Sequence, residues 1–421
     1  MKKNILFLLI DCLRSDVMYG EKGHARTDTL SYLKSIGTSF RNVISVASNT
    51  SPAVASMWTG LNPYAHGIKS LWGYKLHPDC VTLAELLKEN GYRTCALVTG
   101  PLTEELGLNR GFDIYKWRPA DEHLYNGFGD ELANFIGEYS SGGPSFLYVH
   151  FYELHVPRQV TASFQSNQYG GSPYERSLSN LDWYIGRLIE KINLEDTIIV
   201  VHADHGEKYR SSFWENLTRR YKEPLLKIGS RLGPDSRLSR FFWMGHGYHC
   251  YEFLIKVPLI LVGKGIFPQG KHISTTVGQS DIMPTLLEAI GLKKQVPENI
   301  DGMSLMPIIK GDGFPERNFY VQACDPEIPE SEWITGIRTP KWKYLMPQCE
   351  GKRKPVLFDI EKDPAETRNV IKENPRVAIE LKNELLGMMA AGARNYSPES
   401  IQMSDEEKHK VGDLLKGLGY L

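Results

Sequence analysis

Three features are scarce in this sequence, and each scarcity excludes a class of protein. The chain has 421 residues and six cysteines. These cysteines lie far apart without a Cys-x-x-Cys pair, which argues against a disulfide framework and against a thiolate zinc site. The formal net charge is -1, so the composition gives no sign of a nucleic-acid partner. No run approaches the ~20 apolar residues that cross a bilayer.

The N-terminus resembles a secretory signal only in part. Lys2 and Lys3 precede an apolar run, but this run is short, ends at Asp11 and lacks a cleavage site of small residues. A short apolar run that ends in a charged residue fits a buried parallel strand better. We therefore expect a cytoplasmic protein without a transmembrane segment.

Apolar runs and helical patterns alternate through the first three quarters of the chain. This alternation is typical of a mostly parallel sheet that helices cover on both faces. The expected strands are 4–11, 42–47, 92–98, 145–151, 197–201 and 257–262. The expected helices are 27–36, 82–90, 121–139, 174–192 and 282–290.

The pattern changes near residue 316. Short runs at 319–322, 333–337, 342–345 and 356–359 favour antiparallel strands, and two polar helices are expected at 375–390 and 404–418. We therefore predict an α/β domain over residues 1–315 and a small α+β subdomain with an antiparallel sheet over residues 316–421.

A basic segment, residues 208–245, interrupts the first domain. It contains far more Lys and Arg than Asp and Glu, with aromatic and leucine side chains between them. It is either a lid that recruits an anionic substrate or partner, or a solvated helical excursion. The sequence leaves both interpretations open.

Residues 48–60 form the stretch around which the site is expected. Ser51 is a good helix N-cap, Pro52 suits the first turn, and Gly60 suits a left-handed end. Thr50 then precedes a helix N-terminus, where free N–H groups and the helix dipole attract anions. Its hydroxyl is either a nucleophile for a phosphoryl or sulfuryl group or only a capping group.

Acidic and imidazole side chains follow two of the expected strands. Asp11 ends the first strand, and Asp204 and His205 follow the most strand-like run of the chain. The carboxyl ends of parallel strands meet at one edge of a sheet, where α/β folds bind ligands. Two aspartates and a histidine are suitable ligands for a divalent cation, which would lower the pKa of a nearby hydroxyl.

These residues belong to a longer pattern. Over nearly its whole length the sequence resembles the sulfatase family of the alkaline phosphatase superfamily. The matching segments, in order, are 4–16, 50–67, 110–113, His155 with Pro157, 204–207, 245–247, 257–260, 280–287, 357–359 and 363–367. Each segment is a weak signal alone, but their order and spacing together are specific.

The resemblance implies a fold and a set of roles. It implies an alkaline phosphatase-like sandwich that holds one divalent metal ion at Asp11, Asp204, His205 and Thr50. Thr50 matches the nucleophile, which also touches the metal.

Further positions match groups that act on the substrate. His155 and His246 match groups that contact the transferred group or protonate the leaving oxygen. His249 is the alternative to His246, and both His249 and Arg14 are candidate substrate contacts.

The sequence departs from the family pattern at several positions. In sulfatases the nucleophile is a formylglycine made from Cys or Ser in a Cys/Ser-x-Pro-x-Arg motif, whereas here Thr50 and Val54 occupy the first and last positions. Threonine is a secondary alcohol, so the same oxidation would give a ketone, and no formylglycine is expected. Cys12 replaces the second aspartate of the usual pair, which removes one hard oxygen ligand. A lysine that sulfatases usually carry has no counterpart after residues 98–101.

These departures point to branches of the superfamily that use an unmodified threonine. Such branches resemble phosphodiesterases, phosphonate monoester hydrolases and phosphoethanolamine or phosphoglycerol transferases. We therefore predict a metal-dependent hydrolase of phosphate or sulfate esters that forms a covalent intermediate at Thr50, with phosphodiesters or phosphonate esters favoured. The alternatives are a sulfatase, a phospho-headgroup transferase in glycan or lipid modification, and a non-catalytic relative that binds an anion.

The expected substrate is an anionic small molecule, lipid headgroup or glycan ester, and no nucleic acid is expected. The choice among manganese, zinc, calcium and magnesium stays open. The oligomeric state also stays open, with a homo-oligomer among the outcomes.

Overall fold

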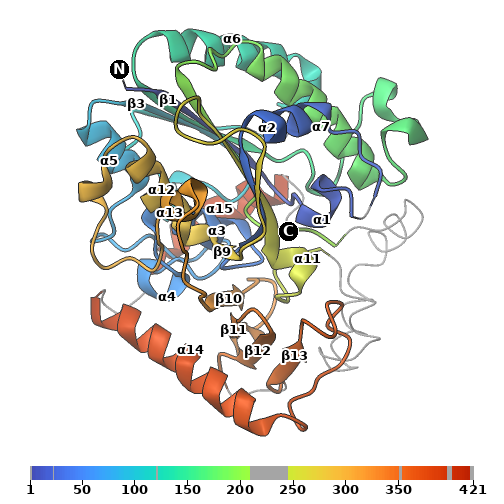
Figure 1. The fold of residues 1–421 in the computed structure, drawn as a ribbon, viewed down its shortest axis with the longest axis vertical. Coiled ribbons are helices and arrows are strands. Elements are labelled where there is room, and N and C mark those ends of the chain that lie inside the picture. Colours follow the sequence, from blue (N-terminus) through green and yellow to red (C-terminus); the bar gives the residue numbers. More distant parts are fainter. Residues whose placement is uncertain are drawn as a thin grey trace.

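The computed structural model describes residues 2–21, 23–119, 122–208, 245–349, 353–395 and 401–417. Among these residues, nine strands form one large sheet, in the order β4-β3-β5-β1-β6-β7-β2-β8 with β9 beside β2 (Figure 1). The strands are β1 (Asn4–Ile10), β2 (Thr38–Ile44), β3 (Arg93–Val98), β4 (Ile114–Trp117), β5 (Ser145–Phe151), β6 (Thr197–His202), β7 (Lys256–Val262), β8 (Lys271–Ile273) and β9 (Val277–Gly278).

The centre of the sheet is parallel. β1 lies between β5 and β6 and is parallel to both, whereas β7 runs antiparallel to its neighbours β6 and β2. β1 is apolar on both of its faces because both faces are covered. The mostly parallel sheet that the sequence predicts is confirmed.

Helices cover the two faces of the sheet (Figure 1). One group contains α2 (Asp28–Ile36), α6 (Phe128–Ser141) and α7 (Pro173–Ile189), which pack against one another. The other group contains α3 (Thr50–Thr59), α5 (Leu83–Glu89), α12 (Ile282–Ala289) and α13 (Met306–Lys310). Shorter or peripheral helices are α1 (Ser15–Met18), α4 (Pro63–His66), α11 (Glu252–Ile255) and α15 (Asp405–Gly417).

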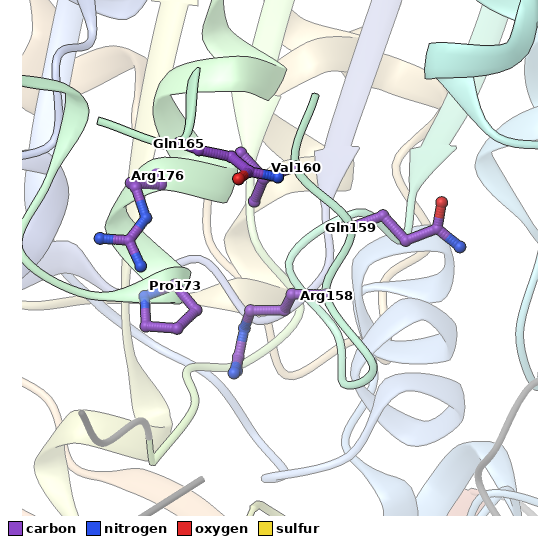
Figure 2. A pocket seen from close by; sticks show the side chains of 6 residues that line it. All are labelled: Arg158, Gln159, Val160, Gln165, Pro173 and Arg176. Carbon is purple, nitrogen blue, oxygen red and sulfur yellow. The ribbon is translucent and has the colours of Figure 1, made fainter. Parts of the chain in front are cut away.

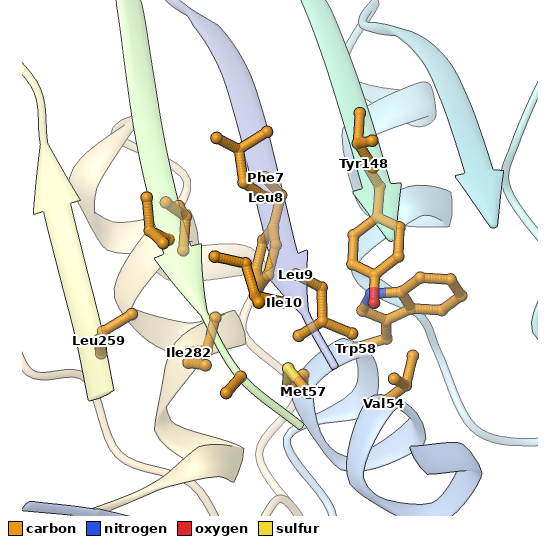
Figure 3. Close-up of a cluster of buried hydrophobic side chains, with 14 of the residues drawn as sticks. Phe7, Leu8, Leu9, Ile10, Val54, Met57, Trp58, Tyr148, Leu259 and Ile282 are labelled. Carbon is orange, nitrogen blue, oxygen red and sulfur yellow. The ribbon is translucent and has the colours of Figure 1, made fainter. Parts of the chain in front are cut away.

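Helix α3 is anchored in the core beneath β1 and β5. Figure 3 shows Met57 and Trp58 of this helix against the strand side chains. The Trp58 ring lies 4.8 Å from that of Tyr148, which lies 5.2 Å from that of Phe7. All ten residues of α3 are buried, so its N-terminal residue Thr50 is held rigidly relative to the sheet.

The C-terminal part forms a separate sheet. Strands β10 (Phe319–Ala323), β11 (Ile334–Arg338), β12 (Trp342–Pro347) and β13 (Val356–Asp359) are antiparallel in this order, and α14 (Pro375–Asn395) packs on one face. The other face packs on residues of the large domain, among them Ile44 and Ile255. The predicted antiparallel C-terminal sheet is confirmed.

Several predicted boundaries are wrong. β2 spans Thr38–Ile44 rather than residues 42–47. It ends at Ile44 because the following residues Val46 and Ala47 pair with Gln322 of the small sheet and leave the large one. α6 begins at Phe128 rather than near residue 121, because Gly127 precedes it in a left-handed conformation, with φ of 92°. The short edge strand β4 was not predicted, since its residues alternate between exposed and half-buried.

The basic segment predicted over residues 208–245 lies mostly outside the described residues. In the part of the chain that is described, no helix is both long enough and apolar enough to cross a membrane.

Candidate active site

The ends of β1 and β6 bring three predicted metal ligands together. Asp11 follows β1 directly, and Asp204 and His205 lie just beyond β6. The Nε2 atom of His205 lies 3.7 Å from Asp11 Oδ1 and 3.4 Å from Asp204 Oδ2. One donor atom from each of the three side chains lies within 4.8 Å of the others, and all three side chains are fully buried.

Thr50 joins this cluster from helix α3. Its Oγ1 lies 3.3 Å from His205 Nε2. Thr50 is the first residue of the helix and Asn49 is the N-cap residue, so the prediction that Ser51 caps the helix is wrong. The Ser51 hydroxyl instead donates to the carbonyl of Leu71. The predicted left-handed end at Gly60 is confirmed, with φ of 70°.

The loop before Thr50 is tied to the other site loops. The Ser45 hydroxyl donates to the carbonyl of Asp204 over 2.6 Å, and the N–H of Gly247 donates to the carbonyl of Ser48 over 2.9 Å. These bonds fix the nucleophile candidate relative to the 204–207 and 245–249 segments. Such positioning is what a reaction at a single hydroxyl requires.

The donor set fits a divalent cation. Asp204 Oδ1 accepts hydrogen bonds from the N–H groups of Cys12 and His205, whereas Oδ2 is buried and accepts none from the described residues. A buried carboxylate oxygen without a donor is costly unless a cation contacts it. The Nδ1–H of His205 donates to the carbonyl of Gly206, which leaves the Nε2 lone pair facing the carboxylates. Burial lowers the pKa of His205 to about 4, so the ring is neutral and able to coordinate.

His246 lies beside the cluster in a charged pair that the sequence did not predict. Its ring lies 4.2 Å from that of His205, and its Nδ1 lies 3.2 Å from Glu207 Oε2. Burial alone would lower the pKa of His246, but the Glu207 carboxylate raises it to about 9. The raised pKa favours a protonated imidazole at neutral pH, which suits a proton donor beside the carboxylates of Asp11 and Asp204.

His155 completes the group of histidines. Its ring lies 5.1 Å from that of His246 and stacks on Tyr152 at 4.7 Å. Its Nδ1–H donates to the carbonyl of Val156, and burial lowers its pKa well below the usual value. His155 is thus a neutral ring beside a charged one.

Arg14 and His249, the two predicted substrate contacts, both interact with other residues of the protein. The Arg14 guanidinium donates to the Asp16 carboxylate and to the carbonyl of Glu207, so it braces the 207 loop. The His249 ring stacks on Tyr251 at 3.7 Å, and its Nδ1 accepts from the N–H of Cys250. Their roles in substrate binding stay predictions.

Cys12 occupies an unusual position. Its φ of 64° is rare for a side chain with Cβ, and its Sγ lies 3.7 Å from Glu207 Oε2 and 3.8 Å from His246 Nδ1. Its sulfur and the nitrogens of His205 and His246 lie within 4.8 Å of one another. Spacing in the sequence does not indicate this group, because the three residues meet only through the fold.

Two further residues of the candidate site were not predicted from the sequence. Glu207 holds His246, and His150 Nε2 lies 3.7 Å from Asp11 Oδ2. Glu207 belongs to the strand-end segment 204–207, and His150 is the penultimate residue of β5, which pairs with β1. Both residues lie at or just after the ends of predicted strands, and this placement is the feature of the sequence that could have identified them.

The chain belongs to the sulfatase family. The model of the family described as "Sulfatase" matches residues 3–292, and that of "N-sulphoglucosamine sulphohydrolase, C-terminal" matches residues 243–391. The resemblance noted in the sequence is confirmed, and with it the class of the protein, a sulfatase-like ester hydrolase.

Individual relatives are distant. Arylsulfatase K of Xenopus laevis is 24% identical, over 91% of this chain and 82% of that protein. Steryl-sulfatase of Rattus norvegicus is 23% identical, and the match covers 69% of this chain and 55% of that protein. Arylsulfatase A of Bos taurus is 24% identical, over 97% and 92% of the two chains.

Solved structures share the fold. Ps i-CgsB, in complex with k-i-k-neocarrahexaose, has a TM-score of 0.71 and 20% identity over 98% of both chains. The phosphonate monoester hydrolase of Agrobacterium radiobacter has a TM-score of 0.70 and 18% identity, over 93% of this chain and 96% of that one. The alkaline phosphatase-like fold is thereby confirmed.

Proposed function

We propose that this chain hydrolyses sulfuric or phosphoric esters of anionic substrates, with Thr50 Oγ1 as the nucleophile. The observation that carries the proposal is the placement of this hydroxyl. It begins a buried helix, lies 3.3 Å from His205 Nε2, and adjoins the buried carboxylates of Asp11 and Asp204. The sulfatase family is dependent on divalent metals, and these residues are suited to hold one.

The sulfuric ester is the first candidate substrate. The relatives named above are arylsulfatases and a steryl-sulfatase, and these names support a sulfate ester here. The phosphoric or phosphonic ester is the second candidate. It is favoured by Thr50 itself, which cannot form the aldehyde, and by the similarity to a phosphonate monoester hydrolase. The preference for phosphodiesters inferred from the sequence stays a prediction.

The mechanism follows from the groups around Thr50. A bound divalent cation would neutralise the substrate oxygens and lower the pKa of the Thr50 hydroxyl. The Thr50 hydroxyl loses its proton to solvent water, Oγ1 attacks the sulfur or phosphorus in line, and the bond to the leaving alcohol oxygen breaks. The N-terminus of a helix favours negative charge, so the first turn of α3, where Thr50 lies, suits oxygens that gain charge.

His246 supplies the proton that the leaving alcohol needs. Glu207 keeps its imidazole charged and oriented before the reaction. The neutral ring that results then accepts a proton from water, which attacks the ester at Thr50. The bond from sulfur or phosphorus to Oγ1 breaks, sulfate or phosphate leaves, and Oγ1 regains a proton from solvent. The same ring thus acts as acid in the first half-reaction and as base in the second.

The test compares 4-nitrophenyl sulfate, 4-nitrophenyl phosphate, bis(4-nitrophenyl) phosphate and 4-nitrophenyl phenylphosphonate, each with calcium, magnesium, manganese or zinc. We expect Thr50→Ala to lose on the order of 10³-fold or more in kcat on the preferred ester, because no oxygen remains to attack. Thr59→Ala is the matched control, since Thr59 lies on the same helix and its hydroxyl bonds to local backbone groups, the carbonyl of Ala55 and the N–H of Leu61. Undiminished turnover by Thr50→Ala would contradict the proposal.

Mass spectrometry of the peptide that contains Thr50 identifies the nucleophile directly. An unmodified threonine that gains a sulfuryl or phosphoryl group during turnover is expected. Turnover that appears only with an acceptor alcohol would favour the transferase alternative. Metal-free protein without turnover would favour the anion-binding alternative. The cytoplasmic location and the oligomeric state stay predictions.

A further inference from the structure

One thiol and two imidazoles meet beside the carboxylates of the candidate active site. The Cys12 sulfur and one nitrogen each of His205 and His246 lie within 4.8 Å of one another. The side chains of Cys12 and His205 are fully buried. We refer to these three residues as the thiol cluster, and their donor atoms differ in kind from the carboxylate oxygens next to them.

The spacing of the thiol cluster fits a small tetrahedral cation. Zinc lies about 2.3 Å from a thiolate sulfur and about 2.0–2.1 Å from an imidazole nitrogen. Two such ligands of a tetrahedral ion are about 3.6 Å apart. The distance between Cys12 Sγ and His246 Nδ1 is 3.8 Å, so these two side chains need little rearrangement to hold one ion.

A fourth donor lies against the thiol cluster. Glu207 Oε2 is 3.7 Å from Cys12 Sγ and 3.2 Å from His246 Nδ1. Arg158, one of the residues around the open pocket in Figure 2, lies 3.8 Å from the same oxygen and helps to hold the carboxylate in this place. One sulfur, two nitrogens and one oxygen make up the four ligands that zinc takes in a closed protein site.

The donor types separate the thiol cluster from the carboxylates of Asp11 and Asp204. Sulfur and nitrogen donors favour zinc, cobalt and similar ions, whereas magnesium and calcium prefer oxygen. His205 belongs to both groups of residues. A neutral imidazole has one nitrogen that accepts, so His205 binds one ion at a time. An ion in the thiol cluster therefore removes His205 from the carboxylate site.

We propose that Cys12, His205 and His246, with Glu207 as the fourth donor, form a second metal site that takes zinc or a similar thiophilic divalent ion. Binding releases the proton of the Cys12 thiol and the proton that His246 donates to Glu207, and bonds from the four donor atoms to the ion form in their place. His246 can then no longer protonate the leaving alcohol, so zinc inhibits ester hydrolysis. The inhibition rests on the proposed function, whereas binding of the ion does not.

Cobalt reports on a thiolate ligand without any turnover. A bond between Co²⁺ and a thiolate gives a charge-transfer absorption in the near ultraviolet, which oxygen and nitrogen ligands do not give. We expect the metal-free protein to gain this absorption with one equivalent of cobalt. Cys12→Ser should lack it, and Cys95→Ser, the control at another buried thiol, should keep it. No absorption in the wild type, or equal absorption in Cys12→Ser, would overturn the inference.

Asp204→Asn tests whether the two sites are separate. This variant should keep the cobalt absorption, because Asp204 is not part of the thiol cluster. Loss of the absorption would mean that the sulfur binds the ion of the carboxylate site, which would overturn a second site.

Zinc affinity, measured against a chromophoric chelator, provides a second measurement. In the Asp204→Asn background, Cys12→Ser and His246→Gln should each weaken zinc binding on the order of 10²-fold. Unchanged affinity in both would overturn the inference.

Inhibition connects the second site to the reaction. Zinc is added to enzyme that turns over a 4-nitrophenyl ester with magnesium or manganese. We expect the zinc concentration for half inhibition to rise about tenfold in Cys12→Ser, relative to the activity of that variant without zinc, and to stay unchanged in Cys95→Ser. Equal inhibition of both variants would overturn the inhibitory role. Thr50→Ala should still give the cobalt absorption, so failure of the proposed function is distinguishable from failure of this inference.

Discussion

Two buried clusters of charge in this protein differ in how they are balanced. The first lies between the small sheet and α11, where Lys343 is fully buried. Its Nζ contacts Glu252 Oε1 at 2.8 Å, Glu366 Oε1 at 2.7 Å and the carbonyl of Cys250 at 2.8 Å. Arg338 pairs with the other oxygen of Glu252 at 3.1 Å. Two carboxylates thus meet two cations within the protein.

The second cluster is the candidate active site. The carboxylates of Asp11 and Asp204 lie next to His205, whose pKa burial lowers to about 4, so this ring carries no positive charge at neutral pH. The charge of the neighbouring His246 is paired with a third carboxylate, that of Glu207. A balanced cluster stabilises the fold without any ligand, whereas buried carboxylates beside a neutral ring are stabilised by an added cation. The balance of charge, rather than burial alone, therefore separates the structural cluster from the candidate metal site.

The largest expected effect is at the active site. Asp204→Asn keeps the oxygen that accepts from the N–H groups of Cys12 and His205 but removes the negative charge. We expect loss of stoichiometric metal and a fall in turnover on the order of 10²-fold or more, since a metal ligand is lost. Metal analysis and steady-state kinetics measure both. The free energy of unfolding without metal should not decrease, and retention of full metal content would contradict the assignment.

The reciprocal change belongs to the structural cluster. Lys343→Met leaves Glu366 buried without its cation, so we expect the free energy of unfolding to fall by about 3–5 kcal/mol. Urea denaturation measures this loss. The metal content of the folded variant should equal that of the wild type. A variant as stable as the wild type would show that the balanced cluster is not structural.

Addition of a divalent metal ion that prefers oxygen ligands, such as magnesium, should stabilise the candidate active site but not the Lys343 cluster. A divalent ion at 100 times its Kd should raise the free energy of unfolding by about 2.7 kcal/mol, because it binds only the folded site. The increase should be the same in Lys343→Met and absent in Asp204→Asn. Thermal or urea denaturation before and after chelation provides the measurement. An equal increase in the free energy of unfolding of Asp204→Asn would mean that the ion binds at another site.

The smallest expected effect is that of pH on the free energy of unfolding through His66, a buried histidine outside both clusters. Burial lowers the pKa of His66 to about 3, and its Nε2–H donates to the Ser56 hydroxyl. The unfolded chain binds a proton near pH 6.5 whereas the folded one does not, so stability falls as the pH falls below 6.5. At pH 5, His66 is expected to lower the free energy of unfolding by about 2 kcal/mol.

Urea denaturation at pH 7.5 and pH 5 measures this contribution. His66→Gln should reduce the difference in unfolding free energy between the two pH values. His409→Gln, at an exposed position of α15, is the control and should leave the difference unchanged. An unreduced difference in His66→Gln would mean that His66 does not contribute to the acid sensitivity.

The sequence by itself determined the architecture and the metal-ligand candidates. Apolar runs such as 4–10 and 197–201 specify strands buried on both faces, because local hydrophobic periodicity is written along the chain. Asp11 and Asp204 follow such runs, so their meeting at one sheet edge follows from topology. The family assignment rested on the order of short segments, which is also a property of the sequence.

The tertiary structure alone decided the contacts between segments that are remote in the sequence. The pairing of Glu207 with His246 and the position of Cys12 beside both depend on side-chain directions set by several loops at once. The departure of Val46 and Ala47 from β2 likewise depends on the small sheet, which lies almost 280 residues further along. Local propensity does not encode such contacts, because the energy that selects them is released only when the remote partners meet.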